Sequence, residues 1–381
     1  MNNLKRILAL VLALMMACSL VACGGKEEVK EETKTETETK TEEKTEEKTE
    51  EKTEEPTMSE EEAWKQEPAY GQKVIYYMAD GCTSGPMLAD LLGYYEEAGL
   101  TAEGYKGTSY TEALGTGLAH VAVGHIATML VPSSNNVDLT FVGGAHVGCK
   151  SLYVLGNSDY KTTADLKGTA ISTPNGVGAS DYNITARLLN ADGINPLSDV
   201  ELIAVETSAC IAAMENGEIS AALLSDTFAY NMVKDGTLRC VRSLLDEDFQ
   251  QEPCCIIAMP TSFVEENPIT AKKISDCVKK AHQWMRENPA EATQFLIDNG
   301  MNSDNLEMNT MLNDSLQFGP SNEFTGKALQ HIVEEYIELG LITSTDDAAE
   351  VMEKAWHPLG EDEYADTDLT FVEPWFVQFQ K

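Results

Sequence analysis

The chain has 381 residues, of which 63 are acidic and 27 are basic, so its formal net charge is −36 at pH 7. A surface this negative repels nucleic acid and anionic lipid headgroups, and we therefore exclude nucleic acid as a partner. From residue 68 onward the composition is that of a globular protein, and its length suits two domains.

The N-terminus has the features of an export signal. Two basic residues precede an apolar stretch at 7–20, which is shorter than the roughly 20 apolar residues needed to span a bilayer. The tetrapeptide Leu-Val-Ala-Cys that ends at Cys23 resembles the bacterial lipobox, in which the cysteine takes a lipid and becomes the mature N-terminus. We expect a signal peptide over 1–22, lipidation at Cys23 and anchoring to the outer face of the cytoplasmic membrane. The alternative is an ordinary secretory signal that is cleaved near Ala22.

A low-complexity segment follows Cys23. Thr-Glu-Glu-Lys units recur, and there are almost no apolar residues before Trp64, so the segment buries too little surface to offset its ordering entropy. We expect residues 23–67 to form a disordered, charged tether that connects the lipid anchor to a soluble body. A helical stalk is the alternative, because Glu and Lys recur at a spacing of four residues.

The rest of the chain alternates between strand and helix patterns. We expect strands at 74–78, 100–105, 120–123, 139–142 and 151–155, then at 169–172, 200–205, 220–224, 238–241 and 254–258. Helices are expected between them at 86–98, 109–117, 181–192, 208–216 and 227–234, and after them at 269–287, 289–299, 325–339 and 345–355. This alternation predicts an α/β protein with two parallel sheets, and the C-terminal helices should pack on the first lobe.

Seven cysteines lie beyond Cys23. Their number is odd and their spacing contains no Cys-x-x-Cys pair, so the sequence does not predict a disulfide framework. Free buried thiols fit this pattern. The seven are Cys82, Cys149, Cys210, Cys240, Cys254, Cys255 and Cys277.

Several segments carry a resemblance to a known family. The most specific is Thr-Ala-Asp-Leu-Lys-Gly at 163–168, and the helix-to-strand steps at 112–123 and 212–222 occur in the same order as in that family. The chain resembles the nitrate/sulfonate/taurine-type binding proteins of ABC importers, which are related to thiamine-pyrimidine precursor binding proteins. His120 and Ser220 depart from the pattern, because the family usually has an acidic residue there.

The resemblance implies a fold and a function. The fold is the two-lobed periplasmic-binding-protein fold of type II-like architecture, with lobe 1 at 68–157 and 253–381, lobe 2 at 158–252, and a hinge between them near 156–160 and 250–254. The function is that of an extracytoplasmic, non-enzymatic solute-binding protein, a monomer without a cofactor, which captures a small organic solute and delivers it to an ABC permease.

Such proteins bind their ligand between the lobes, where strands end and helices begin. The residues expected there include hydroxyl, amide, phenol and carboxylate groups, and Asp226 would favour a ligand with a cationic or hydrogen-bond-donating group. Ser, Thr or Asp before a helix can also be an N-cap without any ligand. The candidates are Cys82, Thr83, Ser84, Ser109, Tyr110, His125, Asn175, Ser180, Thr207 and Asp226.

His146 and Cys149 form a further candidate pair between two expected strands. Their spacing of three residues resembles that of metal ligands, and Cys82 could approach from a neighbouring loop. Contact with the solute, ordinary packing and metal binding all remain open, and no metal ligand is assigned. Cys254 and Cys255 are interpreted as buried apolar residues at the hinge.

Two further functions stay open as alternatives. One is a lipoprotein that binds a metal ion or a metal chelate through His146 and Cys149. The other is an enzyme related to the eukaryotic thiamine-pyrimidine synthase, which has a cysteine-rich iron site where this chain offers Cys254 and Cys255.

Overall fold

The computed structural model describes residues 58–360, 362–367 and 369–380. These residues belong to one unit, Thr57–Lys381. The expected signal peptide, the lipidation site Cys23 and the tether as far as residue 57 lie outside the described residues. Within the described part of the chain, no helix combines the length and the apolar character needed to cross a membrane.

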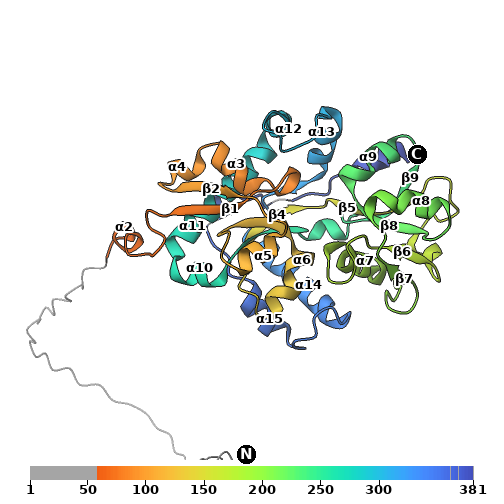
Figure 1. The fold of residues 1–381 in the computed structure, drawn as a ribbon, viewed down its shortest axis with the longest axis horizontal. Coiled ribbons are helices and arrows are strands. Elements are labelled where there is room, and N and C mark those ends of the chain that lie inside the picture. Colours follow the sequence, from red (N-terminus) through yellow and green to blue (C-terminus); the bar gives the residue numbers. More distant parts are fainter. Residues whose placement is uncertain (1–57, 361, 368, 381) are drawn as a thin grey trace, which may run out of the picture. The chain divides into compact units, whose positions relative to one another are not determined.

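Lobe 1 contains a small parallel sheet and a four-stranded sheet, drawn on the left of Figure 1. In the first sheet β1 (Lys73–Tyr77) pairs with β2 (Thr101–Tyr105). The second has the strand order β11-β4-β10-β3 and consists of β3 (Ala122–His125), β4 (Thr140–Val147), β10 (Cys255–Met259) and β11 (Gln317–Phe318).

The alternation of side chains along the buried strands of lobe 1 explains its layers. In β10, Cys255, Ile257 and Met259 belong to one apolar core, whereas Ile256 and Ala258 belong to another on the opposite face. The first face is covered by α3 (Gly85–Leu91), α4 (Tyr94–Glu97), α11 (Pro268–Glu287) and α12 (Pro289–Asp298). The second is covered by α5 (Tyr110–Gly115), α6 (Ile126–Ser134), α14 (Asn322–Glu338) and α15 (Ala348–Ala355). The short α10 (Thr261–Glu266) connects β10 to α11.

Lobe 2 is built on a five-stranded sheet with the order β7-β6-β8-β5-β9. Its strands are β5 (Lys150–Leu155), β6 (Ala170–Ser172), β7 (Glu201–Ile203), β8 (Ala221–Ser225) and β9 (Leu238–Ser243). Its α-helices are α7 (Ser180–Ala191), α8 (Cys210–Glu215) and α9 (Asp226–Lys234), with short 3-10 turns η2 (Thr163–Leu166), η3 (Thr207–Ala209) and η4 (Phe249–Gln251). This confirms the expected α/β class, although the structure has three sheets where two were expected.

The first crossing between the lobes differs from the predicted one. The strand expected at 151–155 in lobe 1 is β5, which pairs antiparallel with β8 and β9 of lobe 2. The chain therefore crosses at Gly148 and Cys149, directly after β4, and the boundary predicted at residue 157 is wrong. A pattern of apolar residues does not reveal which strands will be partners, so it could not assign β5 to its sheet.

The second crossing connects β9 to β10. β9 ends at Ser243 in lobe 2 and β10 begins at Cys255 in lobe 1. Each lobe thus receives one strand that arrives from the other lobe, and β10 runs antiparallel to β3 and β4. The two-stranded sheet is parallel, every pairing in the four-stranded sheet is antiparallel, and the five-stranded sheet is mixed, so the expectation of two parallel sheets is wrong.

The C-terminal segment packs on both lobes. α14 and α15 lie on lobe 1 as expected, but α13 (Leu306–Ser315) and the 3-10 helix η6 (Trp375–Phe379) contribute to the core of lobe 2. Met308 and Trp375 belong to the same core as Tyr153 of β5. The expectation that the whole segment packs on lobe 1 is therefore wrong.

The last part of the predicted tether is folded. A capping box between Ser59 and Glu62 begins helix α2 (Glu60–Trp64). The Trp64 Nε1–H donates to Thr270 Oγ1 at 2.9 Å, and the Glu67 carboxylate accepts the backbone N–H groups of the first turn of α11. The boundary predicted between tether and body at 67–68 is thus about ten residues too late.

Candidate functional site

Six thiol and imidazole side chains gather where the two crossings leave lobe 1. Three of these side chains come from the ends of lobe 1 strands or the loop after β1, and the other three lie on or beside the crossings. They form two overlapping groups that share Cys149, and within each group the donor atoms lie within 4.8 Å of one another. The first group is His125, Cys149, Cys254 and Cys255, and the second is Cys82, His146 and Cys149.

Strand register brings the two histidines of this cluster together. In the sheet of lobe 1, β10 lies between β3 and β4, and Cys255 is the register partner of both His125 and His146. The Cys255 Sγ atom is 3.5 Å from His125 Nδ1. Two of the predicted site residues, far apart in sequence, therefore flank a cysteine that the sequence analysis had interpreted as an apolar packing residue.

The crossings supply the other two thiols. The Cys149 and Cys254 Sγ atoms are 3.3 Å apart, and the Cys254 Sγ is 3.6 Å from the Cys255 Sγ. Cys149 has a φ of 112°, in the left-handed region that non-glycine residues rarely adopt. Preceded by Gly148 at φ 86°, it turns sharply and points its side chain back toward Cys254.

The electrostatics of the cluster reflect its burial. Burial and the nearby Lys150 ammonium lower the pKa of His125 to about 3, so its imidazole is neutral and able to act as a ligand. Hydrogen bonds from Cys149 and Cys255 hold the pKa of the Cys82 thiol well below its usual range. The cluster thus places a thiol whose pKa is lowered close to a neutral imidazole.

His146 is completely buried at the back of the cluster. Its Nδ1 is 3.2 Å from the Val147 carbonyl oxygen and 3.9 Å from the Cys254 Sγ, while its Nε2 has no hydrogen-bond partner among the described residues. A buried polar atom without a partner is costly, and strain, a catalytic role, or a bound water or ion can explain it. His146 therefore belongs to the candidate site by its position as well as by its chemistry.

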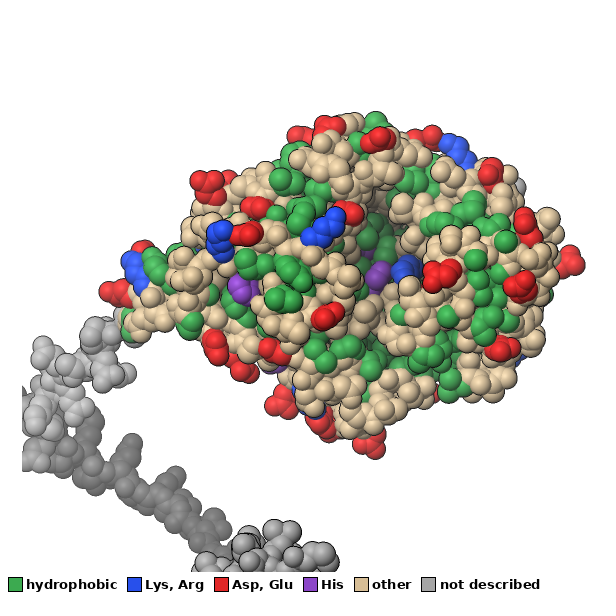
Figure 2. Space-filling model, in the orientation of Figure 1, with side chains coloured by type: hydrophobic (Ala, Val, Ile, Leu, Met, Phe, Trp, Pro, Cys, Tyr) green, Lys and Arg blue, Asp and Glu red, His purple; other side chains and the backbone are tan. Residues whose placement is uncertain are grey.

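A hollow lies above the cluster and is lined by both lobes. Lobe 1 contributes Cys82, and lobe 2 contributes Asp226 and Thr227 at the beginning of α9, with Cys149 between them. The hollow measures about 440 Å³, part of it open to solvent, and α13 and η6 complete its wall. Figure 2 shows this face of the molecule hollowed between the two lobes.

Asp226 is held by other side chains of lobe 2. It is 4% exposed, and its Oδ1 accepts hydrogen bonds from Ser151 Oγ at 2.8 Å and from the Tyr153 hydroxyl at 2.7 Å. Burial raises the pKa of its carboxyl group. Its carboxylate is thus occupied inside lobe 2, although the residue lines the hollow.

Sequence analysis did not identify Lys150 as a site residue. This first residue of β5 directly follows Cys149, and its Nζ donates to the Oγ of Ser180 at the beginning of α7, at 2.8 Å. An ammonium group next to a helix N-terminus forms a favourable surrounding for an anion. A lysine at the start of an expected strand carries no signal of its own, which is why the pattern did not reveal it.

Several other candidates make local hydrogen bonds. The hydroxyl groups of Thr83 and Ser84 donate to backbone oxygens three residues earlier, and Ser109 caps α5 by accepting from the Glu112 N–H. Asn175 is exposed and donates to Asp181. These geometries are those of turns and caps, which was the alternative interpretation of these residues.

Tyr110 and Thr207 are not among the residues that line the hollow. The Tyr110 hydroxyl accepts the backbone N–H of His125 at 3.3 Å, and burial raises the pKa of Tyr110 to about 12. Thr207 lies half-buried in η3 of lobe 2. Their role in binding stays a prediction.

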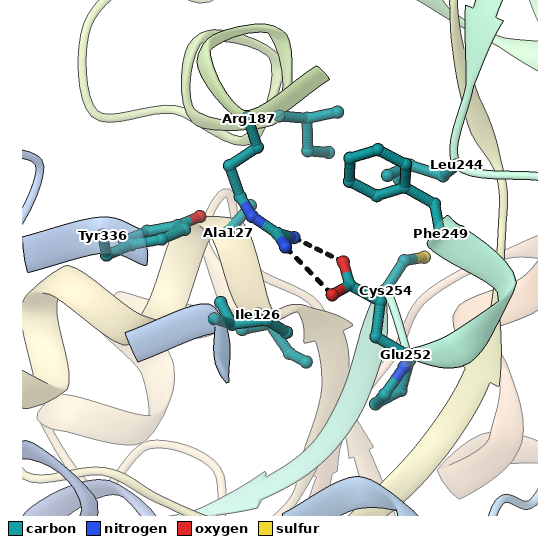
Figure 3. A pocket seen from close by; sticks show the side chains of 11 residues that line it. Ile126, Ala127, Arg187, Leu244, Phe249, Glu252, Cys254 and Tyr336 are labelled. Atoms are coloured by element: carbon teal, nitrogen blue, oxygen red, sulfur yellow. Dashed lines mark hydrogen bonds and ion pairs between the residues drawn. The ribbon is translucent and has the colours of Figure 1, made fainter. Parts of the chain in front are cut away.

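A second hollow lies between the lobes, and the side chain of Arg187 occupies it. Arg187 of α7 faces the Glu252 carboxylate, with Tyr336 and Phe249 beside it (Figure 3). Its Nη2 is 2.9 Å from Glu252 Oε2, and its Nε is 2.6 Å from Glu335 Oε2 on α14. Burial acts to lower the pKa of Arg187, but the two carboxylates more than reverse this effect and raise it. This ion pair connects lobe 2 to the second crossing and to lobe 1.

Comparisons with known proteins agree with the two-lobed architecture. A binding protein of Brucella abortus strain 2308, so named provisionally, is 24% identical over 228 residues, which is 58% of this chain and 69% of the relative. The alkanesulfonate-binding protein SsuA of Xanthomonas axonopodis pv. citri, solved with MOPS, has a TM-score of 0.60 at 18% identity, over 76% of this chain and 99% of that one. The periplasmic nitrate-binding protein NrtA of Synechocystis PCC 6803 has a TM-score of 0.54 at 16% identity, over 77% and 86% of the two chains.

These structural likenesses establish the periplasmic-binding-protein fold, of the kind found in sulfonate- and nitrate-binding proteins of ABC systems. The family model described as NMT1/THI5 like matches residues 83–292, which is more than half of the chain and includes five of the six clustered side chains. The chain therefore belongs to the NMT1/THI5-like family.

Proposed function

We propose that this protein is the solute-binding component of an ABC importer, which captures a small organic solute between its lobes and delivers it to a membrane permease. One observation carries the proposal, namely the hollow that Cys82 of lobe 1 and Asp226 and Thr227 of lobe 2 line together. A solute that contacts both lobes favours the closed state by its differential affinity, and the two crossings serve as the hinge.

Lys150, which directly follows Cys149 but does not itself line the hollow, favours an anionic solute. Lys150 and the N-terminus of α7 supply positive potential next to Ser180. The carboxylate of Asp226, from which the sequence suggested a cationic ligand, already accepts two hydrogen bonds within lobe 2. We therefore revise that hypothesis and expect a sulfonate, carboxylate or similar oxyanion group on the solute.

A binding role is preferred over a catalytic one. The export signal expected at residues 1–22 removes the chain from the cytosolic cofactors that a thiamine-pyrimidine synthase relative would need. The similar proteins reported above are named as binding proteins, and two of them are named for the anion that they bind. Lipidation at Cys23 would keep the captured solute close to the membrane and its permease.

Calorimetry with ethanesulfonate, taurine and nitrate, and with ethylammonium as the cationic comparison, tests the proposal. We expect an anion to bind and the Lys150→Met variant to bind it at least tenfold more weakly, because a charge-assisted hydrogen bond contributes about 1.5–3 kcal/mol. Lys327→Met, which removes an exposed charge of α14, is the matched control and should bind like the wild type. Equal affinity in the Lys150→Met variant, or binding of ethylammonium alone, would contradict the anion preference.

A further inference from the structure

The sequence left a metal site at His146 and Cys149 as one of three interpretations, and the structure gathers more ligands there than those two. His125, Cys149, Cys254 and Cys255 come from the end of β3, the first crossing, the second crossing and the start of β10. One donor atom from each lies within 4.8 Å of every other. These four potential metal ligands come from three separate segments of the chain, because Cys254 and Cys255 are consecutive.

Three of the six distances between these donor atoms are close to the edges of a tetrahedron around a metal ion, and the other three are below 4.8 Å. Zinc bonds of about 2.3 Å to sulfur and about 2.0–2.1 Å to nitrogen place neighbouring donors about 3.5–3.8 Å apart. Here the Sγ atoms of Cys149 and Cys254 are 3.3 Å apart, those of Cys254 and Cys255 are 3.6 Å apart, and the Cys255 Sγ is 3.5 Å from His125 Nδ1. These separations need only small shifts to fit a tetrahedral Cys3His site.

We propose that these four side chains bind one thiophilic divalent metal ion of the Zn²⁺ class at the floor of the cleft. When Zn²⁺ binds, the three thiols release their protons to solvent and coordinate the ion as thiolates. The neutral imidazole of His125 coordinates it through a ring nitrogen and releases no proton. The complex carries a net charge of −1, and the ammonium group of Lys150 lies close enough to influence His125.

A second observation points to a ligand at the same place. His146 is completely buried, its Nε2 lacks a partner among the described residues, and one of its ring nitrogens lies within 4.8 Å of the thiols of Cys82 and Cys149. His146 and Cys82 thus form a neighbouring pair of donors, either of which can replace a member of the Cys3His set. Cys149 belongs to both groups, so it is the residue on which the site depends most.

The position of the site distinguishes a resident metal from a captured one. All of its ligands lie on lobe 1 or on the crossings, so the site is complete without closure of lobe 2. A metal there ties both crossings to the end of the lobe 1 sheet. The metal site therefore does not depend on whether the hollow above it binds an organic solute, and its test is independent of solute binding.

A disulfide is the competing interpretation of this geometry. The Cys149 and Cys254 Sγ atoms are 3.3 Å apart, whereas a bond needs about 2.05 Å, and an exported protein meets oxidising surroundings. A disulfide between these two would use two of the three thiols and abolish the metal site. The experiment must therefore begin from reduced protein and count thiols as well as metal.

The test uses the full chain, reduced and handled without oxygen, and incubated with Zn²⁺ or Co²⁺ before the excess is removed. We expect one metal per chain by elemental analysis and, with Co²⁺, the intense near-ultraviolet absorption of thiolate-to-metal charge transfer. Cys149→Ser should lose at least nine-tenths of the bound metal. Cys210→Ser and Cys277→Ser remove buried thiols outside the cluster and should retain it.

A thiol-protection measurement keeps the proposal testable if Cys149→Ser does not fold. Alkylation of folded wild-type protein should modify Cys149 and Cys254 without Zn²⁺ and spare both with it, as read by mass spectrometry. Absence of metal from the reduced wild type, equal metal in Cys149→Ser and the controls, or a Cys149–Cys254 disulfide that forms despite added Zn²⁺ would each overturn the proposal.

Discussion

Arg187 of lobe 2 and Glu335 of lobe 1 form an ion pair across the boundary between the lobes, with Nε and Oε2 2.6 Å apart. The side chains are 7% and 10% exposed, and the same guanidinium group also binds Glu252 on the second crossing. Both carboxylates are held by one buried cation. The relative position of the lobes in this structure therefore depends on the charge of Arg187. Water can solvate the two carboxylates in its place only if the hollow that Arg187 occupies opens.

Arg187→Met should lower the free energy of unfolding by about 3–5 kcal/mol, because it leaves the buried Glu252 carboxylate without its cation and Glu335 with only the amide of Asn190. Urea denaturation followed by circular dichroism measures this change. Lys327→Met breaks an exposed ion pair of α14 with Glu323 and serves as the control, with an expected effect of at most about 1 kcal/mol. Similar losses in the two variants would show that the lobes do not depend on Arg187.

Gly85→Ala should be strongly destabilising, although Gly85 lies in a helix where alanine is normally favoured. A Cβ atom at this position would lie 2.3 Å from the Nε2 of His282, which is completely buried. Overpacking of this kind costs about 1–3 kcal/mol. In a double-mutant cycle with His282→Ala, the loss in the double variant should be smaller than the sum of the two single losses. Additive losses would contradict the contact.

Local sequence patterns predicted the helices and strands of this fold well. They predicted the pairing between distant segments much less well. Pro268–Glu287 was expected as a helix within one residue of its observed bounds, because proline precedes an amphipathic run. β5 was expected as a strand but assigned to the wrong lobe, since its pattern is the same in either sheet. α13 was not predicted, and Trp375 reaches the core of lobe 2 from the far end of the chain.

The candidate site was predicted in part for the same reason. His125, His146, Cys149 and Cys82 were selected by their place at strand ends and by ligand spacing, and the structure brings them together. The sequence favours the interpretation of Cys255, together with the adjacent Cys254, as a buried apolar residue at the hinge, because vicinal cysteines seldom form a disulfide without strain. Only the register that sets it opposite both histidines reveals its place in the cluster.

Cys23→Ala should release the protein from the membrane or leave its precursor unprocessed. The reason is chemical, since the lipid of a lipoprotein is attached to the thiol of the lipobox cysteine. Membrane fractionation and the mass of the mature chain check this expectation, and Cys277→Ser, which removes a buried thiol, is the control. A variant with wild-type mass that still fractionates with lipid would refute lipidation at Cys23.

A chain that begins at residue 68 should be less stable than one that begins at residue 58. The Glu67 carboxylate accepts the N–H groups of Ile269 and Thr270 at 2.6 and 2.9 Å, and so caps the longest helix of lobe 1. Loss of such a cap costs about 0.5–2 kcal/mol, and Glu67→Gln should show part of this loss. Glu61→Gln, at an exposed position of α2, is the control. Equal unfolding midpoints for the two chains would show that residues 58–67 do not stabilise the body.

His120 should make the stability of lobe 1 depend on pH. Its Nδ1 accepts the backbone N–H of Ile75 at 3.1 Å, its ring stacks on Phe263 with centroids 4.5 Å apart, and burial lowers its pKa in the folded protein. An unfolded chain therefore takes up a proton below about pH 6.5, whereas the folded chain resists it. The stabilising contribution is complete above that pH and is lost as the pH falls through the folded-state pKa.

The comparison with His120→Asn isolates this effect, because an amide oxygen can accept the same N–H group but does not titrate. Between pH 7 and pH 5, urea denaturation should show a larger loss of unfolding free energy in the wild type than in His120→Asn. At pH 7.5 the imidazole is neutral in both states, so the difference between the two proteins there reports packing alone. If the unfolding free energies of the two proteins change in parallel with pH, His120 takes up its proton equally in the folded and unfolded states. The hydrogen bond to Ile75 would then not keep the imidazole neutral.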